Sequence, residues 1–168
     1  MRQTVGDMIR SMVVVLAVVV AILLVTWRPK PDPVRVVDIT PALVAARSAA
    51  PFTIETPALV DLRPTSARWE PTPASDSTPV WHLGYVTPQE EYLQVSQAMV
   101  SGDDFIAEQT AQGVAGETVM ISGVEWRVYS SPDRISVVRT LDGVTTVVSG
   151  TDVLEQIMTA AGSLRAGA

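Results

Sequence analysis

The feature that most constrains this chain is an uninterrupted apolar run near its N-terminus. Between Arg10 and Arg28 lie 17 residues without a charge, Ser11 to Trp27. At about 1.5 Å per residue they form a helix of roughly 26 Å, enough for a thin bilayer if the flanking arginines snorkel outward. A buried core helix is the alternative, but core helices alternate apolar with polar positions, and this run does not. The run therefore predicts a transmembrane helix over 11–28.

The same run could instead be a signal peptide that is removed on export. It is longer than the 7 to 15 residues usual for a cleaved signal, and VTWRPK after it offers no small-x-small cleavage site, so we expect a permanent signal anchor. The flanking charges are nearly balanced, but a short cationic tail before an apolar run is typical of an export signal. We therefore expect a cytoplasmic tail over 1–10, a Pro-rich stalk over 29–39 and an extracytoplasmic domain over 40–168.

Charge and cysteine content exclude several classes of site. The chain carries a formal charge of -6, and from Pro31 onward 8 arginines stand against 17 aspartates and glutamates, a balance near -9. Phosphate binding depends on clustered cations, so this domain is not expected to bind nucleic acid. The chain has no cysteine, which excludes disulfides, thiolate catalysis and thiolate metal sites. We expect no cofactor and no metal.

Three helices are expected beyond the anchor. Thr40 reads as the N-cap of the first, which ends before Pro51. The second is predicted over 101–112, with Ser101 or Asp103 as N-cap and with Phe105 facing inward. Thr151 should cap the third. Its apolar stripe contains Val153, Leu154, Ile157, Met158, Ala161 and Leu164.

Period-two alternation and turn residues predict the strands. They are expected near 67–70, 80–86, 91–98, 117–121, 124–130, 134–140 and 144–150. Ser122-Gly123 and Asp142-Gly143 are typical tight hairpin turns, and a hairpin tip should follow the first strand. The element order predicts an α+β domain in which an antiparallel sheet of about six to seven strands is packed by two to three helices.

His82, the single histidine, is the candidate for nucleophilic catalysis. A Ser-His-Asp arrangement would combine it with Ser96 or Ser101 and a carboxylate such as Asp103. The strand pattern places His82 on the face opposite Trp81, where we expect it to be solvated or hydrogen-bonded at the sheet rim. The sequence contains no nucleotide-binding, phosphate-binding, zinc-protease or hydrolase-elbow motif. We therefore predict no catalytic residue and no enzyme.

Clusters of charge have two readings each. Glu90-Glu91 and Asp103-Asp104 could bind a hard cation or act in acid-base chemistry, but we expect a charged hairpin entrance and a capped helix start. Three arginines on consecutive strands could meet an anionic ligand, although pairing with Glu125 and Asp133 is the simpler expectation. These are Arg127, Arg134 and Arg139.

Aromatic residues could likewise form a surface that stacks on sugars or peptides. The candidates are Trp81, Tyr85, Trp126 and Tyr129. Most of them share the inward parity of their strands, so core packing is expected. Tyr129 and Trp69 are the better candidates for exposure.

Several stretches together resemble one protein family. They are DMIRS at 7–11, WHLGYVTP at 81–88, FIAEQT at 105–110, GVEW at 123–126, RTLDGV at 139–144 and SGT at 149–151. They resemble a family of actinobacterial membrane proteins known as domain of unknown function 4245 (DUF4245). The resemblance covers most of the chain and implies a single-pass actinobacterial envelope protein, but no site residues. The element order is also similar to the PsbP and Mog1 type of sandwich, a fold of adaptor and accessory proteins.

The sequence predicts a tethered, non-catalytic binding or accessory (adaptor) domain, with the membrane and an envelope protein as partners. The alternative is a carrier or sensor for a small apolar or lipid ligand held between sheet and helices. A hydrolase that uses His82 is a third possibility. An enclosed pocket above about 300 Å³ would favour the carrier, and a flat exposed apolar patch would favour the adaptor.

Overall fold

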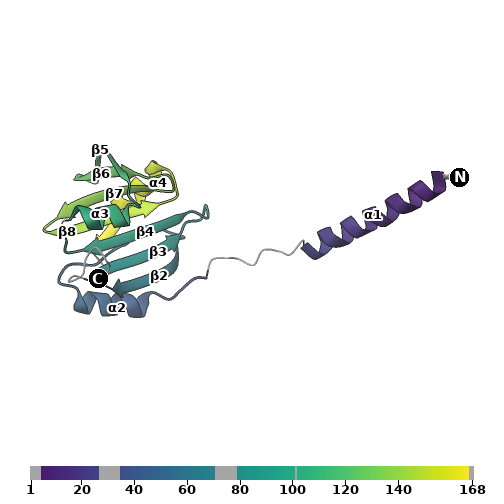
Figure 1. Ribbon diagram of the computed structural model, residues 1–168. Helices are drawn as coiled ribbons and strands as arrows, with labels where there is room; N and C mark the ends of the chain where they lie inside the picture. The colour runs from purple at the N-terminus through teal and green to yellow at the C-terminus, as the bar shows by residue number, and fades with distance from the viewer. Residues whose placement is uncertain (1–4, 27–34, 71–78, 101, 167–168) are drawn as a thin grey trace. The chain divides into compact units, whose positions relative to one another are not determined.

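The computed structural model describes residues 5–26, 35–70, 79–100 and 102–166 (Figure 1). The chain divides into two compact units, Met1–Pro33 and Val34–Ala168. The predicted boundary at residue 40 therefore lies inside the second unit. Most of the predicted stalk, 29–34, falls outside the described residues.

The first unit contains helix α1, Val5–Thr26. Its 22 residues form a helix that begins before the predicted span 11–28 and reaches about 33 Å at the usual rise of ~1.5 Å per residue. Ten large apolar side chains between Met8 and Val20 are 45–73% exposed. Among the residues that the structure describes, no helix meets the length and hydropathy required of a membrane span. The helix itself is confirmed, and its place in a bilayer stays a prediction.

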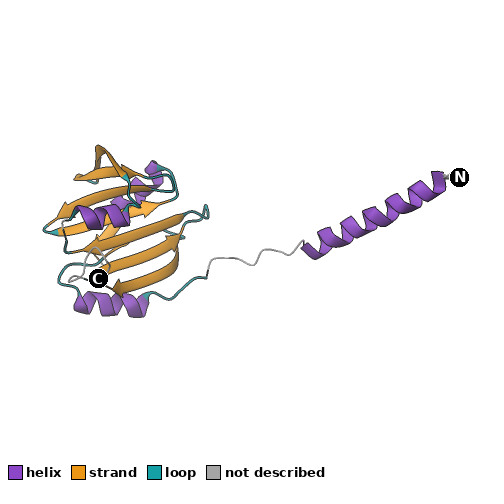
Figure 2. Cartoon of the chain, in the orientation of Figure 1, coloured by secondary structure: helices purple, strands orange, loops and turns teal. Residues whose placement is uncertain are grey.

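The second unit is built on a seven-stranded sheet whose neighbouring strands all run antiparallel (Figure 2). Across the sheet the order is β2 (Arg63–Glu70), β3 (Val80–Val86), β4 (Tyr92–Ala98), β8 (Val144–Gly150), β7 (Ile135–Leu141), β6 (Val124–Ser130) and β5 (Val114–Ile121). The predicted α+β class and antiparallel sheet are confirmed.

Helices cover both faces of this sheet. On one face α2 (Thr40–Ala49) and α4 (Leu154–Gly162) pack over the larger core, which contains Trp81 and Trp126. On the other face α3 (Asp103–Gln109) packs over a smaller core through Phe105. Side chains alternate between the faces along each strand, which is why Trp81 and His82 belong to different layers.

A second, two-stranded sheet was not predicted. It pairs β1 (Glu55–Pro57) with β9 (Leu164–Ala166) in antiparallel register. Strands of three residues are too short to show a period-two alternation. Leu164 fits the apolar stripe of the last helix, so the sequence predicts helix there and not strand. β2 is also longer than the predicted 67–70, and the hairpin tip predicted after it lies outside the described residues, at 71–78.

The three predicted helix caps are wrong in detail. The N-cap positions are Ile39, Gly102 and Val153, and none forms a side-chain cap bond. At α2 the carboxylate of Asp38 instead accepts the backbone N–H of Thr40 at 3.0 Å. Hydrogen bonds from the side chain and then the backbone of Thr40 lower the pKa of Asp38, because they favour the ionised form.

Thr151 does not cap α4, because its polar groups bond a neighbouring strand. Its Oγ1 accepts the backbone N–H of Tyr92 at 3.0 Å, and its own N–H donates to the Tyr92 carbonyl at 3.0 Å. The two tight turns, by contrast, are confirmed: Ser122, Gly123, Asp142 and Gly143 all have positive φ, between 51° and 81°. Two successive residues with positive φ match the type I′ turn that joins twisted strands.

Candidate functional site

His82 lies in a buried polar layer between the sheet and α3, so the solvated alternative is wrong, while the expected hydrogen bond is present. Its side chain is 7% exposed, and its Nδ1 lies 3.1 Å from Ser96 Oγ. The two residues meet because the β3–β4 register places them directly opposite each other. The sequence placed His82 on the correct face, but only the fold brings α3 over that face.

The hydrogen bonds of Ser96 continue through this layer. Its hydroxyl donates to Gln109 Oε1 at 2.9 Å and accepts from Gln94 Nε2 at 2.8 Å. Gln94 in turn accepts the Tyr92 hydroxyl at 3.0 Å. A fully bonded network of this kind holds α3 in register on the sheet.

This layer does not supply the geometry of a hydrolase. Ser96 is 1% exposed, so its hydroxyl has no open path to a substrate. Within the described chain the His82 ring bonds Ser96, and no carboxylate orients it as a catalytic base requires. Ser101 lies outside the described residues. Asp103 and Asp104 stand in the first turn of α3, as predicted.

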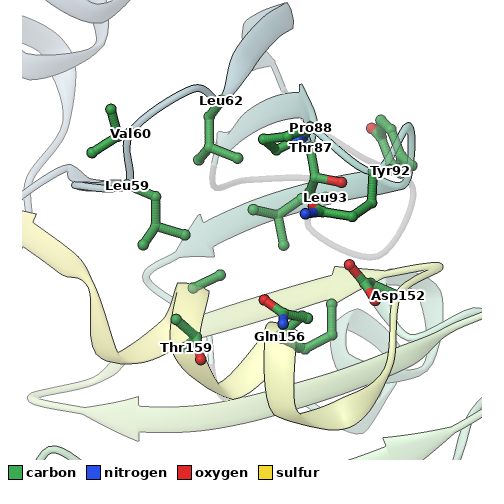
Figure 3. Close-up of a pocket in the computed structure, with 13 residues that line it drawn as sticks. Leu59, Val60, Leu62, Thr87, Pro88, Tyr92, Leu93, Asp152, Gln156 and Thr159 are labelled. Carbon is green, nitrogen blue, oxygen red and sulfur yellow. The ribbon is translucent and has the colours of Figure 1, made fainter.

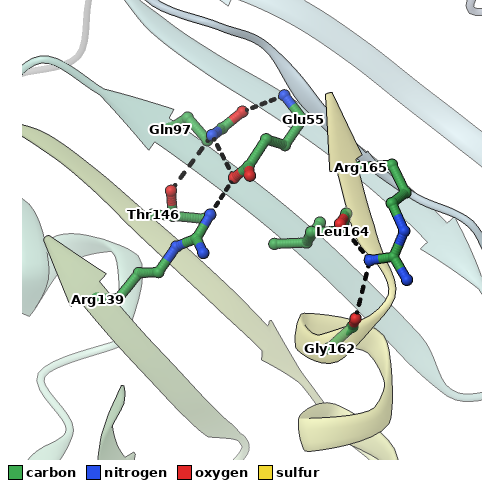
Figure 4. Close-up of polar contacts among 7 residues, drawn as sticks. All are labelled: Glu55, Gln97, Arg139, Thr146, Gly162, Leu164 and Arg165. Atoms are coloured by element: carbon green, nitrogen blue, oxygen red, sulfur yellow. Dashed lines mark hydrogen bonds and ion pairs between the residues drawn. The ribbon is translucent and has the colours of Figure 1, made fainter. Parts of the chain in front are cut away.

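Arg139 belongs to a second polar cluster, on the opposite face (Figure 4). Its guanidinium pairs with the carboxylate of Glu55 and lies 4.8 Å from the centroid of the Trp126 ring. The predicted partners Glu125 and Asp133 are therefore wrong for Arg139. Arg127 sits at a register position of the α3 face, opposite Val138, whereas the Glu55–Arg139 pair lies on the other face.

Glu55 is also held by Gln97 in the middle of the sheet. Gln97 Nε2 donates to Glu55 Oε2 at 3.1 Å and to Thr146 Oγ1 at 3.2 Å, while Gln97 Oε1 accepts the Glu55 backbone N–H at 2.8 Å. A hollow of about 380 Å³ lies beside this cluster, next to the exposed side chains of Met99 and Leu141. Because Glu55 already neutralises Arg139, the cluster ties β1 to the sheet and presents no free cation.

A groove lies between three segments that are distant in sequence (Figure 3). Its walls are the loop at 59–62, the turn at 87–89 and one side of α4, and its volume is about 200 Å³. The buried side chains of Leu93 and Ile157 supply an apolar floor. Asp152 and Gln156 stand at the rim in Figure 3. An apolar floor with a few polar groups around it is the usual form of a recognition site.

A more open apolar surface, about 440 Å³, lies where the end of β5 meets α4. Its apolar side chains are Met120, Ile121, Leu154 and Met158, and Met120 is 63% exposed. β5 is an edge strand, since it pairs with β6 alone in the sheet.

The sequence reasoning did not single out the groove residues. Leu59, Val60 and Leu62 stand in a proline-rich stretch without regular periodicity, and their apolar character is the one available signal. Glu90-Glu91, which the sequence predicts as a charged hairpin entrance, lies between the lining residues Gln89 and Tyr92. Across the described residues, no cluster of three or more acidic, His or Cys side chains could hold a metal ion.

Comparison with known proteins identifies the family of this chain. A comparison with curated proteins gives no match. A family model described as Protein of unknown function (DUF4245) matches residues 1–164, nearly all of the 168-residue chain. The chain therefore belongs to the DUF4245 family.

Proposed function

We propose that this protein is a membrane-tethered binding domain that acts as an accessory or adaptor subunit of the cell envelope. The observation that carries the proposal is α1, a unit of its own that exposes ten large apolar side chains. Successive helical residues are about 100° apart, so the run Met12–Leu16 alone covers the whole circumference. A helix that is apolar all round needs lipid or protein around it.

Binding, rather than carriage of a small molecule, is favoured by the hollows of the domain. The groove of about 200 Å³ is smaller than the ~300–1,000 Å³ usual for ligand pockets. The larger hollows, about 380 and 440 Å³, are flanked by exposed side chains such as Leu141 and Met120. A carrier for a small apolar or lipid ligand remains the second candidate, and it would have to use one of these open surfaces.

The proposal includes a location. The tail at 1–10 would lie in the cytoplasm, and the second unit would lie outside the membrane of an actinobacterial cell. Support comes from the cationic tail before the apolar run and from the family resemblance. The acidic balance near -9 of the later chain suits a domain that stands away from an anionic lipid surface.

Fractionation of cells tests the tether. We expect the intact chain, with its original N-terminus, in the membrane fraction after alkaline extraction. Leu16→Arg combined with Val19→Arg should release it, because each arginine at a helix centre costs about 2.5–3.5 kcal/mol of insertion free energy. Val114→Arg on β5, where Val114 is 76% exposed, is the matched control and should stay membrane-bound. A mature form that begins after Trp27 would overturn the tether, and full protection from added protease on wall-stripped cells would reverse the orientation.

A further inference from the structure

We propose that the groove in Figure 3 docks an extended segment of a partner protein, anchored by one bulky apolar side chain flanked by arginine or lysine. The inference rests on the proposed function, because it names the partner chemistry of a binding domain. It assigns this chemistry to the space between the 59–62 loop, the 87–89 turn and the first two turns of α4.

The size of the groove suits a side chain better than a whole ligand. Its volume of about 200 Å³ equals roughly six or seven water molecules at about 30 Å³ each. Leu93 and Ile157, which line it, are 2% and 1% exposed. Leu59 and Leu62 of the loop line the groove on the side of Leu93 (Figure 3). A single apolar side chain can therefore leave water and contact apolar atoms on several sides.

The charge around the groove decides which residues should flank that side chain. The three wall segments, 59–63, 87–93 and 151–160, contain five carboxylates and one arginine, Arg63. The carboxylates are Asp152, which lines the groove, and Asp61, Glu90, Glu91 and Glu155, each of which is next in sequence to a lining residue. Asp152 at the rim, with an excess of carboxylates on the neighbouring positions, attracts a basic segment and repels an acidic one, which gives specificity and a faster encounter.

The walls are held in place without a ligand. Tyr92 and Thr151 exchange two hydrogen bonds of 3.0 Å, which join the start of β4 to the segment before α4. Across the turn, Thr87 N–H donates to the Glu91 carbonyl at 2.9 Å, and Glu91 N–H donates to Thr87 Oγ1 at 3.2 Å. Because the groove is already formed, little conformational entropy is lost in ordering its walls when a ligand binds.

The test uses the full chain in nanodiscs of zwitterionic lipid and a fluorescent peptide that contains one leucine flanked by arginines. Fluorescence anisotropy should show binding that weakens with added salt. Replacing the peptide leucine by glycine should weaken binding about ten-fold or more, since the buried side chain is lost. Replacing the arginines by glutamates should also weaken it about ten-fold or more.

Substitutions in the protein locate the binding site. Gln156→Trp and Thr159→Trp, both at exposed positions of α4, fill the groove and should abolish binding. Asp152→Asn keeps the oxygen that accepts the Val153 N–H, removes the charge, and should weaken binding up to about five-fold. Arg127→Gln on β6, away from the groove, is the control and should leave binding unchanged. An unchanged melting temperature shows that each variant is folded.

The outcomes separate this inference from the proposed function. Equal binding of the arginine and glutamate peptides, or binding that survives both tryptophan variants, overturns the docking groove. A photoreactive residue placed in cells at Gln156, at Met120 and at Gln112 then tests the wider proposal. Protein crosslinks at Met120 without any at Gln156 refute the docking groove but not the tethered adaptor. The absence of protein crosslinks at all three positions refutes both the groove and the adaptor.

Discussion

His82 Nδ1 lies 3.1 Å from Ser96 Oγ beneath α3, and this contact ties the charge of one ring to the packing of a helix on the sheet. Burial lowers the pKa of His82 below its ordinary 6.5, and the cation of Arg68 on β2 acts in the same direction. Glu70 on β2 and Glu108 on α3 oppose the shift.

The lowered pKa of His82 predicts a loss of stability in mild acid. The unfolded chain takes up the proton near pH 6.5, while the folded chain resists it. The free energy of unfolding should therefore fall as the pH drops below 6.5, and it should level off below the native pKa. Urea unfolding of the full chain in detergent, followed by tryptophan fluorescence between pH 7.5 and 5, measures this slope.

His82→Gln is the control for the pH effect. It should flatten the slope over that range, because the chain contains no other histidine. An identical slope in the wild-type chain and in this variant would contradict the assignment to His82.

Two buried serines on the α3 face should respond in opposite ways to the same substitution. Ser96→Ala should lower the free energy of unfolding by about 1–3 kcal/mol, because Gln94, Gln109 and His82 each lose a partner. Ser136, which is 0% exposed, has no hydrogen-bond partner among the described residues. Ser136→Ala should leave that free energy unchanged or raise it by up to about 1 kcal/mol. Equal losses at both positions would show that Ser136 is satisfied in solution.

The Glu55–Arg139 pair should contribute more to the free energy of unfolding than an ordinary surface ion pair does. Its side chains are only 20% and 13% exposed, and together with Gln97 it links β1 to the sheet. Glu55→Gln should lower the free energy of unfolding by about 1–3 kcal/mol, because the Arg139 cation loses its counter-charge. This range lies between the values typical of exposed and of buried ion pairs. Denaturant midpoints of the full chain measure the loss.

The exposed pair Arg68–Glu70 provides the comparison. Its side chains are 60% and 49% exposed. Glu70→Gln should change the free energy of unfolding by less than about 0.5 kcal/mol. If Glu55→Gln proves equally mild, the cluster in Figure 4 does not fasten β1.

Gly150 at the end of β8 is required by close packing. A Cβ there would stand 2.5 Å from the Tyr92 carbonyl oxygen and 2.6 Å from Ile157 Cδ1. Gly150→Ala should therefore lower the free energy of unfolding by about 1–3 kcal/mol, because the added methyl group overpacks the site. It should also disturb the groove floor, since Ile157 has to move. Gly116→Ala, where the nearest atom is 3.5 Å away, should stay within about 0.5 kcal/mol of the wild type. Thermal unfolding of both variants compares the two positions.

The strands and the large core were predictable because their signals are local. Trp81, Leu83 and Trp126 alternate with polar neighbours, and Asp142-Gly143 marks its turn within two residues. Helix ends were less predictable. Thr151 looked like a cap, but it bonds Tyr92, 59 residues earlier in the chain.

The sequence by itself determined the α+β class, most strand positions, the apolar run and the family, because periodicity and turn chemistry act over a few residues. Only the tertiary structure places α3 over His82 and pairs Glu55 with Arg139, 84 residues later in the chain. It also brings three distant segments together at the groove. Such contacts depend on which elements the sheet order brings together, and that order results from the packing of the whole domain.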